Sequence, residues 1–318
     1  MELDDVSFQF LQEITDGFSM ERILGEGAFG VVYKGVTENG DAVAVKKLRL
    51  RDGKLGYKQL QNEFYNLKKL KHENIVQILG YCYETKEITL IMPDGSKISA
   101  DERYTTLCFE YLHNGSLQKH LSDEFSELDW HTQFKIIKGI CDGLKYIHVE
   151  KEKPIYHLDL KPDIILLDKD MVAKIADFGL SRIFGNELTW ITQSPYGTLI
   201  GYVLGYRPPE YIDSGEISEK FDIFSLGVVM IRIVTGPKGY PKCLDMSSDE
   251  FIDQVQRNWR NRLQANRITD SALETYCHQV KTCTQIALDS VQKDRHKRPD
   301  IQWTAWTGNN NLTTYKII

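Results

Sequence analysis

The chain has 318 residues, of which 42% are hydrophobic and 26% are charged, and its formal net charge is −6. This composition is typical of a soluble globular protein with one or two domains and a large core. The negative charge argues against a general nucleic-acid-binding protein, because the release of counterions needs a basic surface. Six cysteines without paired spacing argue against a disulfide framework and against a zinc site.

No segment of the sequence is expected to insert directly into a membrane. The start, Met1 to Asp5, is acidic where a secretory signal would be basic and then apolar, and it lacks the glycine needed for myristoylation. The most apolar stretch, Ile223 to Val234, is too short to span a bilayer and contains Arg232. We therefore expect a cytoplasmic protein, which would depend on a partner for recruitment to the plasma membrane.

The first third of the chain has the pattern of a small sheet with one helix. Residues 22–48 alternate valine-rich stretches with glycine turns, among them Asn39-Gly40, which predicts an antiparallel meander. From Tyr57 to Lys71 apolar residues recur at helical spacing, which predicts one amphipathic helix. They are Leu60, Phe64, Leu67 and Leu70.

After about Leu112 the pattern becomes mainly helical. Helices are predicted at 130–148, 221–234 and 271–291. The sequence therefore predicts an α+β protein in which a small β-rich lobe with one main helix precedes a larger, mainly helical lobe, with a cleft between the lobes.

Three segments interrupt this pattern. Residues 84–103 predict an added hairpin between two strands. Near Gly197 a Leu-Gly-Tyr element occurs twice, with an extra Ile in the first copy, which suggests a short insertion after Thr198. After about Asp300 the chain is polar and rich in turn residues, so irregular structure is expected there.

A glycine pattern, Gly25, Gly27 and Gly30, lies between two strand-like segments. Glycines at these spacings let the backbone fold over a triphosphate, with amide groups facing its oxygens. Considered alone, the pattern fits a structural hairpin equally well. Because the chain continues into a strand, a dinucleotide-binding unit is disfavoured, since there the glycine turn opens a helix.

A lysine and a glutamate follow the glycine pattern. Lys46 ends the strand-like Val43-Ala44-Val45, where its ammonium group would neutralise phosphate charge. A lysine at the end of a strand is more often simply exposed to solvent, so a carboxylate must fix it. Glu63, one turn before Leu67 on the predicted helix, is the carboxylate that we expect. A solvated helix glutamate is the alternative, which the spacing to Lys46 disfavours.

Two further motifs are typical of phosphoryl transfer. Asp159 is placed to accept a hydroxyl proton, and Lys161 is placed to face the transferred phosphate. In the phosphoryl-transfer motif, a Mg²⁺-binding Asn stands five residues after the aspartate, but this chain has Ile164 at that position. Downstream, Asp177 of an Asp-Phe-Gly tripeptide would bind Mg²⁺ that bridges the phosphates.

These motifs, in this order, resemble the protein kinase family over about residues 18–300. Pro208-Pro209-Glu210 resembles the end of its activation segment, which implies an ion pair between Glu210 and Arg298. Asp222 resembles the buried helix aspartate that anchors the catalytic loop. The resemblance implies ATP and Mg²⁺ as cofactors, with ATP contacts from Leu24, Gly25, Gly27, Gly30, Val32, Ala44, Lys46, Glu63, Phe109, Glu110, Leu112 and Leu166.

The segment 107–117 looks like the hinge of plant receptor-like kinases. The resemblance implies that Phe109 is the gatekeeper and that the Glu110 carbonyl and the Leu112 amide bond adenine. Gly80-Tyr81-Cys82-Tyr83 strengthens a likeness to cytoplasmic and cysteine-rich receptor-like kinases of grasses.

The same resemblance implies the class of substrate and partner. Lys161 and Thr198 point to Ser/Thr specificity, so a protein substrate with a Ser or Thr hydroxyl is expected. A membrane receptor or receptor kinase is the expected partner in signalling.

The sequence departs from the family at two catalytic-loop positions. Leu158 replaces an Arg that reads a phosphate on the activation segment, so switching by phosphorylation there is disfavoured. Ile164 has no oxygen for Mg²⁺, cannot bond the backbone around Asp159, and would place apolar bulk in a charged, hydrated site. This loss corresponds to roughly two to four decades in rate.

Two functions therefore stay open. One is an ATP-dependent Ser/Thr protein kinase of reduced activity, and the other is a nucleotide-binding pseudokinase or scaffold. A structural remnant that binds no nucleotide is a third reading. The expected domains are an N-terminal flank at 1–17, a kinase domain at 18–305 with lobes at about 18–111 and 112–305, and an irregular tail at 306–318.

Overall fold

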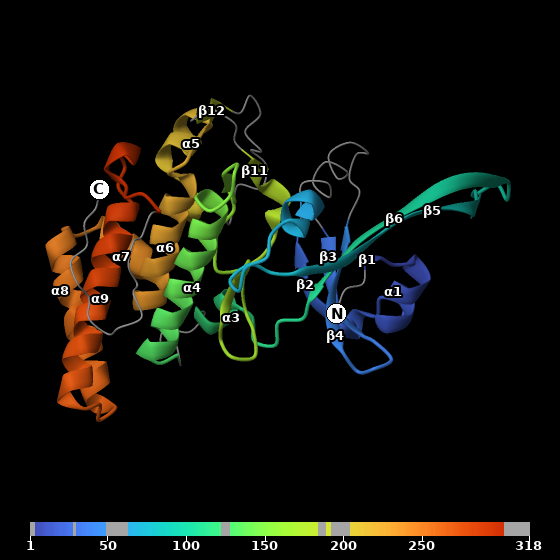
Figure 1. Cartoon of the computed structure of the whole chain (residues 1–318). Helices are drawn as coiled ribbons and strands as arrows, with labels where there is room; N and C mark the ends of the chain where they lie inside the picture. Colours follow the sequence, from blue (N-terminus) through green and yellow to red (C-terminus); the bar gives the residue numbers. More distant parts are fainter. Residues whose placement is uncertain are drawn as a thin grey trace. The chain divides into compact units, whose positions relative to one another are not determined.

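The computed structural model describes residues 4–27, 30–48, 63–121, 128–183, 189–191 and 204–301 (Figure 1). The described residues form two compact units. Unit 1 lies within Met1–His113 and adds Asp177–Leu180, and unit 2 lies within Asn114–Ala176 and Ser181–Ile318. Unit 1 is built on a sheet and unit 2 mainly on helices, which confirms the predicted α+β class.

Unit 1 contains a six-stranded sheet with the order β1-β5-β6-β4-β3-β2. Neighbouring strands of this sheet are antiparallel, except for β1 and β5, which are parallel. The elements are β1 (Asp4–Asp5), α1 (Phe8–Ile14), η1 (Met20–Arg22), β2 (Ile23–Gly27), β3 (Gly30–Val36), β4 (Ala42–Leu48), β5 (Ile78–Ile91), β6 (Lys97–Glu110) and η2 (Phe178–Leu180).

The predicted meander is confirmed as β2, β3 and β4. Between β3 and β4 the Thr37 N–H donates to the Asp41 carbonyl at 3.0 Å, and Gly40 has a φ of 83°. This left-handed conformation is accessible to glycine without a steric penalty, which explains why the Asn39-Gly40 pair marks the turn.

Residues 84–103 form the expected hairpin, but as the outer part of two longer strands rather than as an element added between them. They belong to β5 and β6 themselves, which are each 14 residues long and pair from Ile78 with Phe109 to Ile91 with Lys97. The strands are simply longer than expected, because alternating polar and apolar residues continue the β pattern beyond the sheet.

Two short helical parts of unit 1 differ from the sequence analysis. Within the 1–17 flank, α1 packs Phe8, Leu11 and Ile14 onto the sheet, although its seven residues are too few for a periodic signal. The helix predicted at 57–71 is described only for 63–68, with its start outside the described residues, and it ends three residues earlier than expected.

Unit 2 contains the predicted helices as α4, α6 and α9, with ends that differ by at most one residue from those expected. Its helices are α3 (Leu117–Leu121), α4 (Trp130–His148), α5 (Pro209–Ser214), α6 (Phe221–Thr235), α7 (Gly239–Leu244), α8 (Ser248–Ala265) and α9 (Asp270–Ser290), with 3-10 turns η3 (Leu204–Tyr206) and η4 (Arg295–Lys297). Helix α6 forms the core of unit 2. A Cβ at Gly227 would lie 2.8 Å from the Ala287 carbonyl oxygen, so this glycine lets α6 and α9 pack closely.

Three small sheets complete unit 2. Their strand orders are β10-β9-β7, β11-β8 and β12-β13. The strands are β7 (Gly115–Ser116), β8 (Ile155–Tyr156), β9 (Ile165–Leu167), β10 (Ala173–Ile175), β11 (Arg182–Ile183), β12 (Thr189–Ile191) and β13 (Glu216–Ser218). Among the helices of the described residues, none has the length and apolar character needed to cross a bilayer.

Candidate active site

In unit 1, Lys46 lies at the centre of three charged side chains. It is on β4 between Val32 of β3 and Leu107 of β6, and only 8% of it is exposed. Its Nζ lies 2.9 and 2.8 Å from the two carboxylate oxygens of Glu63 and 2.9 Å from Oδ1 of Asp177. The structure therefore forms the predicted pair of Lys46 and Glu63 and adds Asp177 to it.

Burial and the interactions among the three side chains shift the pKa values of this cluster. Burial opposes the charge of Lys46, but the carboxylates of Asp177 and Glu63 outweigh it and raise the pKa of the lysine above its usual value. Burial raises the pKa of Glu63 to about 7, although Lys46 acts in the opposite direction. The lysine therefore stays charged at neutral pH, whereas Glu63 completes its ionisation only above neutrality.

Asp177 presents its carboxylate from a left-handed backbone conformation, with a φ of 62°. Aspartate adopts this conformation more readily than most residues, and such backbone conformations gather at functional sites. The Asp177 side chain is 26% exposed, in contrast to Lys46 and Glu63, and the next residue, Phe178, is fully buried. The burial of Phe178 fixes the segment, while the carboxylate stays accessible to solvent.

The three glycines of the glycine pattern have different surroundings. A Cβ at Gly30 would lie 2.3 Å from the Lys47 carbonyl oxygen, so close pairing of β3 and β4 already requires this glycine. Among the described residues, a Cβ at Gly25 or Gly27 would meet nothing within 4 Å. The fold itself therefore gives no packing reason for these two glycines, and the space beside them is open to a ligand.

The expected adenine-contacting residues of unit 1 lie on paired strands or just after them. Phe109 pairs with Ala44 across β6 and β4 and is buried. Glu110 ends β6, and its carboxylate accepts a hydrogen bond from the Gln77 N–H at 2.8 Å. Leu112 follows and is also buried, whereas Leu24 on β2 is 38% exposed. Leu166 lies on β9 of unit 2.

In unit 2, Asp222 holds the start of the catalytic loop. This α6 residue is fully buried, and its carboxylate accepts hydrogen bonds from the backbone N–H groups of His157 at 2.6 Å and Leu158 at 2.8 Å. His148, at the end of α4, lies 2.8 Å from the same carboxylate through Nε2. No sequence motif predicted a role for His148, because only the tertiary structure brings the end of α4 to α6.

These bonds keep Asp222 ionised and constrain the loop. Burial opposes its ionisation, but the hydrogen bonds from His148 and Leu158 lower the pKa of Asp222 below its usual value. Leu158 has a φ of 66°, an unfavourable conformation for a branched apolar residue. The bond from its N–H to Asp222 stabilises this conformation directly before Asp159.

The loop then presents Asp159 and Lys161 together. Asp159 is 8% exposed, and its Oδ2 accepts a hydrogen bond from Lys161 Nζ at 2.7 Å. The His157 ring contacts the backbone at two places. Its Nε2 lies 2.9 Å from the Ala176 carbonyl oxygen, and its Nδ1 lies 3.3 Å from the Asp159 amide nitrogen. Asp159 is thus fixed through backbone and side-chain bonds.

Ile164 is buried, which the sequence did not predict. The residue is only 7% exposed. Its N–H donates to the Lys161 carbonyl at 3.2 Å, and its carbonyl accepts from the Ala176 N–H at 3.0 Å. The isoleucine therefore belongs to the packed part of the loop, although it still supplies no side-chain oxygen.

Leu158 is part of an apolar cluster and does not take over the role of the Arg that it replaces. Its side chain is buried with Ile217 of β13 and Phe221 of α6, and Tyr156 and Tyr211 pack against the cluster. A phosphate at this position would find apolar side chains, which is consistent with the expected lack of phosphate reading.

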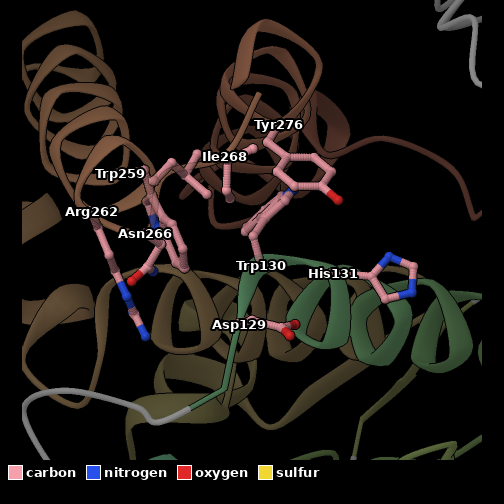
Figure 2. Close-up of a pocket in the computed structure, with 9 residues that line it drawn as sticks. Asp129, Trp130, His131, Trp259, Arg262, Asn266, Ile268 and Tyr276 are labelled. Carbon is pink, nitrogen blue, oxygen red and sulfur yellow. The ribbon is translucent and has the colours of Figure 1, made fainter. Parts of the chain in front are cut away.

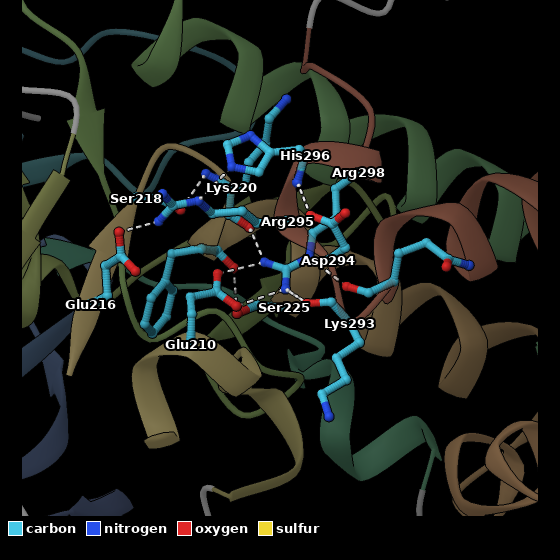
Figure 3. Close-up of polar contacts among 12 residues, drawn as sticks. Glu210, Glu216, Ser218, Lys220, Ser225, Lys293, Asp294, Arg295, His296 and Arg298 are labelled. Atoms are coloured by element: carbon cyan, nitrogen blue, oxygen red, sulfur yellow. Dashed lines mark hydrogen bonds and ion pairs between the residues drawn. The ribbon is translucent and has the colours of Figure 1, made fainter. Parts of the chain in front are cut away.

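The predicted pair of Glu210 and Arg298 is confirmed (Figure 3). Two nitrogens of the Arg298 guanidinium donate to the two Glu210 oxygens at 2.7 Å each, and the Arg298 side chain is fully buried. Arg295 also pairs with Glu216, and Lys220 pairs with Asp300. Segment 293–301 is therefore attached by charged contacts to α5, to β13 and to Lys220, the residue before α6.

Some expected features cannot be placed. Thr198 and the apparent insertion after it, residues 28–29 of the glycine loop, and the tail 302–318 lie outside the described residues. Within the described residues, no group of three or more His, Cys, Asp or Glu side chains is arranged to hold a metal ion.

A pocket of about 140 Å³ opens in unit 2, but it contains none of the expected site residues (Figure 2). It lies where α4, α8 and α9 meet, and Trp130 and Trp259 form much of its wall. Their indole N–H groups donate to Gln279 and to the Val234 carbonyl, both at 2.8 Å. These bonds serve the packing of unit 2, so the pocket does not compete with the catalytic loop as the candidate site.

Comparison with known proteins gives a consistent result. Residues 18–305 match the family model for the protein kinase domain. The chain is 36% identical over 306 residues to cysteine-rich receptor-like protein kinase 26 of Arabidopsis thaliana, covering 94% of this chain and 43% of that protein. It is 37% identical over 293 residues to the G-type lectin S-receptor-like serine/threonine-protein kinase RKS1 of the same plant, covering 90% and 32%.

A third relative is covered more fully. Cysteine-rich receptor-like protein kinase 44 of Arabidopsis thaliana is 34% identical over 298 residues, which is 92% of this chain and 73% of that protein. The chain thus spans less than half of the length of the first two relatives and about three quarters of the third.

Proposed function

The chain belongs to the protein kinase family, and from this premise we propose that it transfers the γ-phosphate of ATP to Ser and Thr hydroxyls of proteins, at a reduced rate. The observation that carries the proposal is the buried contact of Lys46 with both Glu63 and Asp177. Placing the buried Lys46 against two carboxylates is costly unless the contact serves a further purpose.

In unit 1 this cluster is proposed to bind the phosphates. Lys46 neutralises phosphate charge, Glu63 orients Lys46, and the backbone at Gly25 and Gly27 approaches the phosphate oxygens. Asp177 fits a Mg²⁺ site, because Mg²⁺ commonly uses one or two carboxylates together with water and phosphate oxygens, and this carboxylate is accessible. When bound, Mg²⁺ would supply positive charge against the phosphates.

The adenine contacts in unit 1 are proposed from the same family pattern. The Glu110 carbonyl and the Leu112 amide are the hydrogen-bonding groups. Leu24, Val32 and Ala44 are the apolar contacts, with Phe109 as gatekeeper.

In unit 2 the proposed roles are those of the reacting groups. Asp159 accepts the proton of the attacking hydroxyl, and Lys161, 2.7 Å from its carboxylate, supplies positive charge toward the transferred phosphate. Asp222 acts indirectly, because its bonds to the backbone of His157 and Leu158 keep Asp159 in place.

The domain boundaries and the cellular context belong to the same proposal. We assign the kinase domain to 18–305, with a flank at 1–17 and a tail at 306–318. A Ser/Thr-containing protein is the substrate, and a membrane receptor or receptor kinase recruits this cytoplasmic chain to the plasma membrane.

A γ-phosphate transfer assay tests the proposal. The purified protein with Mg-ATP and a Ser/Thr-rich substrate should give label incorporation above that of an Asp159→Ala variant. Because Asp159 contributes to proton transfer and positioning, the variant should lose at least about a hundredfold in rate. Equal incorporation by the two proteins would exclude phosphotransfer by this site.

Ile164 favours a second function, a nucleotide-binding pseudokinase or scaffold. The buried isoleucine leaves the second metal-ligand position without an oxygen. An Ile164→Asn variant should then raise the phosphotransfer rate by at least about tenfold. An unchanged rate would show that this position does not limit activity. A structural remnant predicts no thermal shift with Mg-ATP, whereas both nucleotide-binding functions predict stabilisation.

A further inference from the structure

The distal half of the β5–β6 ribbon carries a surface that the kinase reaction does not use. In Figure 1 the ribbon extends beyond the other strands of unit 1. Among the described residues, β1 pairs with β5 only at Gly80 and Tyr81, and β4 reaches β6 only from Thr106 onward. The remaining ribbon is two-stranded, and an isolated two-stranded ribbon in water is only marginally stable.

One face of this distal ribbon is apolar. Ile88 pairs with Ala100, and Leu90 pairs with Ile98. Residues two apart on a strand share a face, so these four side chains form one strip, here called the apolar ribbon face. Leu90 is 42% exposed and Ile98 is 44% exposed. Ile88 and Ala100 are half-buried. Exposed apolar side chains that adjoin one another are typical of an interaction site.

The same face already holds a helix nearer the sheet. The Phe8 N–H at the start of α1 donates to Glu84 at 2.6 Å, and the Phe8 ring stacks on Tyr104 with centroids 3.8 Å apart. Lys86 lies over the Phe8 ring at 5.4 Å. Glu84, Lys86 and Tyr104 share the face of Ile88 by alternation. Helix α1 starts at Phe8, so the apolar ribbon face continues its packing surface outward.

The ribbon also has an excess of negative charge. Residues 84–103 contain five acidic and three basic side chains, a formal net charge of −2. Three of the carboxylates accept hydrogen bonds from neutral hydroxyls, in the pairs Glu87 with Ser99, Asp94 with Ser96, and Glu102 with Tyr104. Their charge is retained, so a basic partner would be attracted to the ribbon. By alternation Glu84, Glu102 and Lys86 lie on the face of Ile88, and Glu87 and Asp101 lie on the opposite face.

We propose that the apolar ribbon face is a docking site for an amphipathic helix of a partner protein whose apolar side is flanked by Lys or Arg. The partner helix continues the layer that α1 begins, with its apolar side on Leu90 and Ile98. Recognition of this kind buries an apolar helix face in a complementary surface, while flanking charges set orientation and partner choice. The site acts independently of phosphotransfer.

Two other occupants fit the observations less well. A second copy of the chain would bring the same acidic excess against itself. A membrane with anionic lipids would be repelled by the same charge. The basic amphipathic helix satisfies both the apolar strip and its acidic surroundings.

The test uses the full chain and synthetic peptides. The probe is a fluorescent Lys/Leu helix of about 18 residues, long enough to be helical, with a scrambled peptide and a Glu/Leu peptide as matched probes. Binding is measured by fluorescence anisotropy for the wild type and for a Leu90→Ser, Ile98→Ser double variant. Ile91→Ser is the control, because Ile91 is 72% exposed and lies on the opposite face.

The wild type should bind the Lys/Leu helix at least about tenfold more tightly than the double variant, because burial of two apolar side chains is lost. The Ile91→Ser control should bind like the wild type, and the scrambled and Glu/Leu peptides should bind more weakly. Equal binding by the wild type and the double variant would overturn the proposal, as would equal binding of the Glu/Leu peptide.

The alternative occupants give distinct results. A dimer in analytical ultracentrifugation that the double variant abolishes would assign the face to a second copy. Sedimentation with phosphatidylserine vesicles that the double variant abolishes would assign it to lipid. Either result would replace the proposed occupant. Thermal unfolding checks that each variant folds, and if the double variant does not, Leu90→Ser alone carries the test with a smaller loss.

Discussion

The candidate residues of the two units are held in different ways. In unit 1, Lys46, Glu63 and Asp177 contact each other directly through charged side chains. In unit 2, the central carboxylate, Asp222, binds backbone amides, and the side chain at the second metal position is the apolar Ile164.

Under the proposed function, this difference would separate the binding of a nucleotide from the transfer of its phosphate. The cluster of unit 1 has the charges that phosphates and Mg²⁺ require. The loop of unit 2 keeps Asp159, the proposed proton acceptor, in a well-bonded geometry, but Ile164 supplies no oxygen at the proposed second metal position. A defect confined to one half can lower the rate while it leaves affinity intact.

The largest expected effect is on the backbone anchor of unit 2. An Asp222→Ala substitution leaves two buried N–H groups and His148 without their acceptor, so the free energy of unfolding should fall by about 3–5 kcal/mol. Chemical denaturation measures this loss. Asp300→Ala is the matched control, because its 62% exposed carboxylate should cost less than about 1 kcal/mol. Similar losses for the two variants would contradict the anchoring role.

A smaller loss is expected at the metal-ligand position. Because Ile164 is buried, Ile164→Asn should lower the free energy of unfolding by about 2–4 kcal/mol, even if it raises the phosphotransfer rate. Ile164→Val, which keeps the side chain apolar, should cost only about 1 kcal/mol. Rates should therefore be compared per folded molecule. A stability cost near zero for Asn would show that this position is hydrated in solution.

The pH dependence of stability sharpens the description of unit 1. Burial raises the pKa of Glu63 from 4.5 to about 7, so the folded protein binds a proton that the unfolded chain releases. The stability from this proton is fully present below about pH 4.5 and is lost as the pH rises through 7. The free energy of unfolding of the wild type, minus that of Glu63→Gln, should therefore be about 2 kcal/mol larger at pH 5.5 than at pH 8. A difference independent of pH would exclude the raised pKa.

The smallest effect concerns affinity. Lys46→Met should weaken Mg-ATP binding by about tenfold, or about 1.4 kcal/mol, because a charge close to the phosphates is lost. Isothermal titration calorimetry measures this change. Lys47→Met is the control, because the Lys47 ammonium lies 4.7 Å over the Phe18 ring and is not part of the cluster. An equal loss for both lysines would indicate a general charge effect rather than a specific contact.

Much of the fold could be predicted because its signals are local. The apolar period of 3.6 residues placed α4, α6 and α9, and the Asn39-Gly40 turn placed the hairpin of β3 and β4. Helix α1 gave no such signal, because seven residues are too few for a period to emerge. The length of β5 and β6 was also missed, since the strand pattern does not show where a sheet ends.

Some features of the candidate site could likewise be predicted from local motifs, whereas others depend on the tertiary structure. Motif order placed Lys46, Glu63, Asp159 and Asp177 in the chain and predicted the pair of Glu210 and Arg298. The hydrogen bond between His148 and Asp222 joins residues 74 positions apart, and no sequence motif predicts it. The burial of Ile164 was also missed, because burial depends on the neighbours that the fold supplies.

The sequence by itself determined the family and the chemical groups of this protein, because spacing along the chain fixes which residue types are present and in what order. Only the tertiary structure decided how these groups are held: Asp177 in contact with Lys46, the backbone of Leu158 bonded to Asp222, Ile164 buried, and an apolar ribbon face left exposed. The physical reason is that burial and long-range pairing depend on distance in space, which the sequence does not contain.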